Sequence, residues 1–366
     1  MKRNLVRGVW LLVAITVVFS HRAWALTNSL TLINLTGGIT NFTGTGIRIG
    51  QVEGTGVPDS NHVYLLGQIA FTTNIVGGTS GTLASHATEV AGVMVSTDAV
   101  YRGFAPGARV YSAEDPSPYG PSAQTNTIQA AWYVTTNQNV RVINMSDRTV
   151  TNLPTLGTDY ASLGVDALVR STGVIFVKSS GNSGPGTNTI SEPGGAFNII
   201  AVGAISNRGT TATSPGVGVA DFSSRGYLGD TRSKPDIVAP GEYIAMPTFT
   251  NVPSAPYTNR AVNDGTSFAA PHVAGVAARL LQAGSNLFTG TTRTDAQDAR
   301  TIKAVLLNSA TKMSNWSPGT TFTLTSGGPD VRQPLDRHQG AGLLILMRFQ
   351  DETKCGTVAH GKTTPD

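Results

Sequence analysis

The stretch NDGTSFAAPHVAGVAARLL, residues 263–281, contains the most informative helix signal in this chain. From Phe268 onward it is apolar almost all the way round, which is typical of a helix buried in a large core rather than one on a surface. Pro271 limits where this helix can begin, because proline is tolerated only in the first turn. We therefore expect the helix to begin close to Ser267 and to place that hydroxyl at the positive end of the helix dipole, a good position for a nucleophile.

Short apolar runs alternate with segments of helical composition along the rest of the chain, and loops rich in Gly, Ser, Thr, Asn and Pro separate them. This alternation predicts an α/β fold with a mainly parallel sheet. The expected strands are residues 47–52, 109–113, 140–145, 174–178 and 198–202. The expected helices are residues 85–95, 125–136, 160–171, 267–283 and 298–309.

Residues 1–25 have the composition of a secretory signal, with cationic residues first, an apolar run over residues 9–19 and a small-residue cleavage site at Ala25. The apolar run is too short to span a bilayer. Removal of residues 1–25 would lower the number of Lys plus Arg from 26 to 22, which equals the 22 Asp plus Glu. A net charge near zero without a basic cluster argues against nucleic acid or an anionic membrane as a partner.

We therefore expect an exported protein, extracellular or periplasmic, whose mature chain carries no membrane anchor. The chain has one cysteine, Cys355, so its stability must come from a hydrophobic core and not from disulfides. Residues 26–348 are long enough for a single large domain, which we expect to be monomeric, and residues 349–366 have the composition of a polar tail.

Residues 265–275, Gly-Thr-Ser-Phe-Ala-Ala-Pro-His-Val-Ala-Gly, resemble the serine segment of the subtilisin-like proteases. The resemblance implies an α/β/α sandwich in which Ser267 attacks a peptide carbonyl and His272 is structural. Residues 85–92, Ser-His-Ala-Thr-Glu-Val-Ala-Gly, are similar to the histidine segment of that family and make His86 the candidate general base. Ser85 could cap this helix and place His86 in its first turn.

The third member of such a triad is a carboxylate that orients the imidazole, and in subtilisin the chain order is acid, histidine, serine. Where the family has Asp-Ser/Thr-Gly after an apolar strand, this chain has Glu53-Gly54-Thr55-Gly56. Glu53 is the first candidate, although its extra methylene requires the backbone to retreat or the side chain to fold. Asp59, just beyond a proline, and Glu89, three residues after His86, are the alternatives.

Residues 174–184 resemble the strand of the family that leads to Gly-Asn, so the resemblance implies that Asn182 and the Ser267 N–H hold the oxyanion. Residues 142–146 resemble the strand that pairs with substrate, but the family's Ser-Leu-Gly-Gly is here Ser146 followed by Asp147, Arg148 and Thr149. We expect main-chain pairing of an extended peptide along residues 146–148 and Gly181. The Arg148 Cβ would narrow the primary pocket. Asp147 would either favour a basic substrate side chain or lie in solvent.

The resemblance extends over residues 45–347 and predicts an exported serine endopeptidase that cleaves proteins or peptides through an acyl-enzyme. No cofactor is required for that chemistry. The family often binds structural calcium, but no ligand set is identifiable in this sequence. About twenty residues separate Ala25 from Gly46, fewer than the propeptide usual in the family. This short segment, together with Glu53 in place of the family's aspartate, leaves a second hypothesis. The chain would then be a subtilisin-like pseudoenzyme that binds extended peptides without cleaving them.

Overall fold

The computed structural model describes residues 41–115, 122–147, 157–206, 217–227, 232–251, 257–317, 321–322, 331–332 and 335–345. The predicted signal segment, the predicted polar tail and Arg148 lie outside these ranges.

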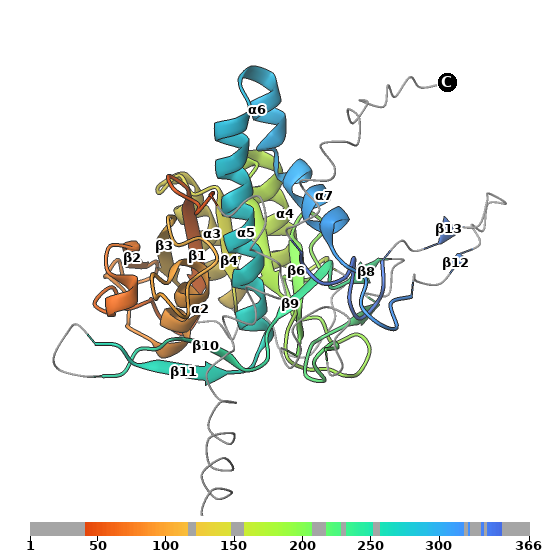
Figure 1. Ribbon diagram of the computed structural model, residues 1–366, viewed down its shortest axis with the longest axis horizontal. Helices are drawn as coiled ribbons and strands as arrows, with labels where there is room; N and C mark the ends of the chain where they lie inside the picture. The colour runs from red at the N-terminus through yellow and green to blue at the C-terminus, as the bar shows by residue number, and fades with distance from the viewer. Residues whose placement is uncertain are drawn as a thin grey trace, which may run out of the picture.

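A seven-stranded sheet forms the centre of the molecule, in the order β2-β3-β1-β4-β5-β6-β9, and all its neighbouring strands are parallel (Figure 1). Parallel strands need long crossover connections, which the helices between them supply. The strands are β1 (Arg48–Glu53), β2 (Ile69–Asn74), β3 (Arg109–Glu114), β4 (Val142–Met145), β5 (Ile175–Ser179), β6 (Ile200–Ile205) and β9 (Ile237–Pro240).

Helices cover both faces of the sheet and give three layers. On one face α2 (Ser85–Val95) and α5 (Thr266–Leu287) pack together, and α5 runs along the strands (Figure 1). On the other face lie α3 (Ala123–Thr136) and α4 (Tyr160–Thr172). Successive side chains of β5 point to opposite faces of the sheet. Val177 packs in the core under α5, and Phe176 packs in the core under α3 and α4.

Smaller elements surround this sandwich. They are η1 (Val63–Leu65), α6 (Gly290–Ala296), α7 (Ala299–Ser309) and the two-stranded pairs β7 (Gly226–Tyr227) with β8 (Ser233–Lys234), β10 (Ile244–Pro247) with β11 (Arg260–Asn263), and β12 (Thr321–Phe322) with β13 (Val331–Arg332). The β10–β11 pair lies at the end of the molecule where α5 begins (Figure 1).

The expected strands and helices are all present, with ends shifted by four residues or fewer. Two strands of the central sheet were not expected from the sequence: β2, an edge strand with polar residues, and β9, which has four residues and ends in a proline. Helix α6 and the β10–β11 pair were not expected either. The expected cap of α2 is wrong. Ala84 is the N-cap, without a side-chain hydrogen bond, and Ser85 is already the first helical residue.

The start of α5 also differs in detail from the expectation. The helix begins at Thr266, so Pro271 lies beyond the first turn, inside the helix. The residue four positions before Pro271 is Ser267, whose carbonyl therefore receives no N–H from the helix. The energetic cost of this proline is reduced if another donor reaches that carbonyl.

Candidate active site

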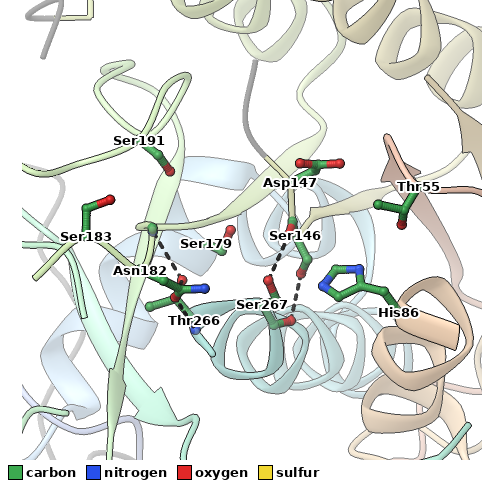
Figure 2. Close-up of a pocket in the computed structure, with 11 residues that line it drawn as sticks. Thr55, His86, Ser146, Asp147, Ser179, Asn182, Ser183, Ser191, Thr266 and Ser267 are labelled. Carbon is green, nitrogen blue, oxygen red and sulfur yellow. Dashed lines mark hydrogen bonds between the residues drawn. The ribbon is translucent and has the colours of Figure 1, made fainter. Parts of the chain in front are cut away.

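The predicted site residues meet at one end of the sheet. The carboxyl ends of parallel strands lie along a common edge, and there β1 ends at Glu53, β4 leads into Ser146 and β5 leads into Gly181. A cavity of about 470 Å³ opens at this edge (Figure 2). Its lining consists of Thr55, His86, Ser146, Asp147, Ser179, Gly181, Asn182, Ser183, Ser191, Thr266 and Ser267.

Glu53 is the carboxylate in contact with the candidate base. Its Oε2 lies 3.0 Å from His86 Nδ1, and the Glu53 side chain is fully buried while that of His86 is 31% exposed. A buried acceptor at Nδ1 places the hydrogen of a neutral imidazole on that nitrogen and leaves Nε2 as the basic atom. The longer side chain of glutamate therefore reaches the imidazole from the end of β1.

The two alternative acids are engaged elsewhere. Asp59 accepts a hydrogen bond of 2.6 Å from the Tyr257 hydroxyl. Glu89 accepts hydrogen bonds from Thr248 Oγ1 at 2.6 Å and from Asn263 Nδ2 at 2.9 Å. Both carboxylates are buried. The partners of Glu89 tie the β10–β11 region to α2, while Tyr257 is joined to the segment that follows β1 through Asp59. Neither makes a hydrogen bond to His86 among the described residues.

Burial and charge act on the Glu53–His86 pair in opposite directions. Burial raises the pKa of Glu53 above its ordinary value, and the contact with His86 offsets only part of this effect. Burial alone would lower the pKa of His86, but the charge and hydrogen bond of Glu53, with a further contribution from Asp147, raise it above the ordinary value. The pair therefore holds its proton on His86 to a higher pH than a solvated histidine would.

Ser146 and Ser267 are joined by two reciprocal hydrogen bonds (Figure 2). The Ser267 hydroxyl donates to the Ser146 carbonyl at 3.0 Å, and the Ser146 hydroxyl donates to the Ser267 carbonyl at 2.8 Å. The Ser146 hydroxyl therefore gives the Ser267 carbonyl the hydrogen bond that Pro271, which has no N–H, cannot donate. Among the described residues, no hydrogen bond joins Ser267 Oγ to the His86 ring, so proton transfer between them requires rotation of the serine side chain.

Asn182 is held in one orientation by the residue that precedes the candidate nucleophile. Its Oδ1 accepts from the backbone N–H of Thr266 at 2.9 Å and from Thr266 Oγ1 at 2.8 Å. Because Oδ1 is occupied in this way, the amide NH₂ is the part of Asn182 that can face the cavity. Thr266 Oγ1 also accepts from Gly181 N at 3.1 Å. Thr266 was not singled out from the sequence, although its place before Ser267 was the available signal.

The predicted substrate-binding residues are only partly described. Ser146, Asp147 and Gly181 line the cavity, while Arg148 lies outside the described residues. Asp147 Oδ2 accepts from Gly54 N at 2.8 Å, so this acid contacts the loop after Glu53. Gly181 has φ +110°, and a Cβ there would lie 2.8 Å from both Ser191 Oγ and Ser224 Oγ. The wall of the cavity therefore requires glycine at this position.

Within the ranges that the structure describes, no group of three or more His, Cys, Asp or Glu side chains is arranged to hold a metal ion. The structural calcium that the family often binds is therefore assigned no ligands here. The described helices include none that is long and apolar enough to cross a bilayer.

Known proteins resemble this chain in sequence. A family model described as "Subtilase family" matches residues 68–342. Pyrolysin of Pyrococcus furiosus is 35% identical over 209 residues, which cover 51% of this chain and 14% of pyrolysin. Serine protease AprX of Bacillus subtilis is 32% identical over 55% of this chain and 49% of AprX. A subtilisin of Bacillus sp. TA39 is 32% identical over 65% of this chain and 57% of the relative. The chain thus spans less than two thirds of the length of each of these relatives.

Solved structures share the fold. Fervidolysin from Fervidobacterium pennivorans, a keratinolytic enzyme related to subtilisin, superposes with a TM-score of 0.61 at 21% identity over 88% of this chain and 44% of fervidolysin. The S41 psychrophilic protease superposes with a TM-score of 0.60 at 25% identity over 85% of this chain and 97% of that protease. The expected three-layer α/β architecture is therefore confirmed.

Proposed function

Because the chain belongs to the subtilase family, we propose that it is a serine endopeptidase that hydrolyses protein or peptide substrates through an acyl-enzyme. The observation that carries this proposal is the 3.0 Å contact between Glu53 Oε2 and His86 Nδ1, with His86 lining the same cavity as Ser267 and Asn182. An imidazole held by a buried carboxylate next to a serine is the arrangement that activates a hydroxyl for attack.

In the proposed reaction, Ser267 Oγ turns from the Ser146 carbonyl toward His86 and attacks the carbonyl carbon of the substrate while Nε2 of His86 takes its proton. The C–N bond then breaks, and the leaving amine receives that proton. Water attacks the acyl-enzyme by the reverse proton route, which releases the acid and restores Ser267. Glu53 holds the imidazole and stabilises its charged form. No metal or cofactor takes part in these steps.

The Asn182 amide and the Ser267 backbone N–H would hold the negative oxygen of the tetrahedral intermediate. Ser267 lies at the N-terminus of α5, where the helix dipole also favours negative charge. Donors of this kind act on charge that develops in the transition state, and loss of one costs roughly 10²–10³ in turnover. Thr266 contributes by fixing the direction of the Asn182 amide.

An extended peptide would lie along the ends of β4 and β5, paired through main-chain groups near Ser146 and Gly181. The alternative of a pseudoenzyme gains no support here. One motive for it was the replacement of aspartate by Glu53, and the 3.0 Å contact of this glutamate with His86 supports the enzyme instead. We also propose that residues 1–25 direct export and that the mature enzyme acts as a monomer.

A fluorophosphonate probe tests this function, because it labels only an activated serine. We expect the purified chain to be labelled, Ser267→Ala to lose all labelling and Glu53→Gln to lose most of it. Asp59→Asn is the matched control, since Asp59 is a buried carboxylate bonded to Tyr257 and not to His86. A folded wild-type chain that is never labelled would refute the enzyme and favour the peptide-binding hypothesis.

A further inference from the structure

A fully buried lysine lies behind the cavity, next to two serines of its wall. Lys178 is in β5, in register with Met145 of β4, and its side chain has no exposed surface. Its Nζ donates to the Ser179 carbonyl at 2.6 Å, to Ser179 Oγ at 3.1 Å and to Ser191 Oγ at 3.4 Å. Both serines line the cavity that holds Ser267 (Figure 2). The proposed reaction uses none of these three side chains.

The contact with Lys178 determines what the Ser179 hydroxyl can offer to a substrate. The lysine side chain acts as the donor here, so Ser179 Oγ is the acceptor and its own hydrogen must be donated elsewhere. In the part of the chain that the structure describes, no hydrogen bond has the Ser179 hydroxyl as its donor. Ser191 differs, because its hydroxyl already donates to the Ser180 carbonyl at 3.2 Å. Of the two serines, Ser179 is therefore the one that presents an O–H donor to the cavity.

This donor lies where the substrate side chain on the acyl side of the scissile bond, called P1, would enter. Ser146 and Ser179 come directly after Met145 and Lys178, which are in register on the adjacent strands β4 and β5. If the substrate carbonyl lies between Ser267 and Asn182, as proposed above, the neighbouring P1 side chain would enter the part of the cavity that Ser146 and Ser179 line. His86 lies on the opposite side of Ser267 from Asn182, where the amine would leave (Figure 2).

On the basis of the proposed function, we propose that Ser179, with its hydroxyl oriented by Lys178, selects a P1 side chain that carries an oxygen acceptor at its tip, as in glutamine or glutamate. Methionine has nearly the same length and shape as glutamine but no comparable acceptor, so it would leave the buried hydroxyl without a partner. A site built to hydrogen-bond a polar group discriminates against analogues that lack it. Ser179 is the specificity-determining residue, and Lys178 is a positioning residue that acts through it.

The test compares peptides that are identical except for Gln, Glu or Met at P1. We expect wild-type kcat/KM to be roughly tenfold or more higher for Gln and Glu than for Met, as one hydrogen bond to a buried donor allows. Ser179→Ala should bring the Gln-to-Met ratio close to one by slowing the Gln peptide while cleavage of the Met peptide is retained. Lys178→Met should reduce the same ratio. If that variant does not fold, Ser179→Ala decides the question alone.

Ser183→Ala is the matched control, since Ser183 also lines the cavity but makes no contact with Lys178 among the described residues. Its Gln-to-Met ratio should equal that of the wild type. A wild-type enzyme that cleaves the Met peptide as fast as the Gln peptide overturns the inference, as does an unchanged ratio in Ser179→Ala. In both cases fluorophosphonate labelling of Ser267 shows that the proposed function survives. If the probe does not label Ser267 and no peptide is cleaved, the proposed function and the inference fail together.

Discussion

Replacing Glu53 with aspartate would restore the acid that the subtilisin-like family has at this position, yet we expect it to impair this enzyme. The Glu53 carboxylate now lies 3.0 Å from His86 Nδ1. Removal of one methylene withdraws the carboxylate by about 1.5 Å, the length of one C–C bond. The resulting separation of about 4.5 Å exceeds the range of a hydrogen bond. The shorter acid would therefore be buried without its partner.

A hydrogen bond to a charged group contributes about 1.5–3 kcal/mol, so its loss from the transition state should lower kcat/KM by roughly 10- to 150-fold. The assay is kcat/KM for a peptide substrate at a pH where the wild type is fully active, with thermal unfolding to confirm that the variant is folded. Glu53→Gln keeps the length of the side chain and removes its charge, and it should lose at least as much activity. Full activity in Glu53→Asp would show that the distance from β1 to the imidazole does not require glutamate.

Two further predictions concern the neighbours of the triad. Activity should rise with pH through the raised pKa of His86, because the base must be neutral. Asp147→Asn removes a charge that raises this pKa, so it should move the rising limb of the kcat/KM profile to lower pH. A limb that stays in place would mean that Asp147 does not act on His86. Ser146→Ala should lower the free energy of unfolding by about 1–3 kcal/mol, since it leaves the Ser267 carbonyl buried without a donor. Pro271→Ala restores a helical N–H to that carbonyl, so Ser146→Ala should cost less in the Pro271→Ala background when both are measured by urea denaturation. Equal costs in the two backgrounds would refute this coupling.

The residue pattern alone was sufficient to predict the layered fold and to propose three of the candidate site residues. Strands and helices follow from periodic burial along the chain, which is a local property, and the weak edge strand β2 and the four-residue strand β9 were missed because they carry little of that signal. Ser267, His86 and Asn182 stand in segments whose order of residues is distinctive. Each could be recognised without knowing what lies beside it.

The choice among Glu53, Asp59 and Glu89 depended on the tertiary structure. All three carboxylates are buried, and only the packing of the end of β1 against α2 shows that Glu53 is the one that contacts His86. The same holds for the position of Lys178 behind the cavity, since its neighbour Ser191 comes from a loop beyond the strand. Contacts between segments distant in sequence depend on how strands and helices pack. No local pattern of residues specifies which side chains this packing brings together.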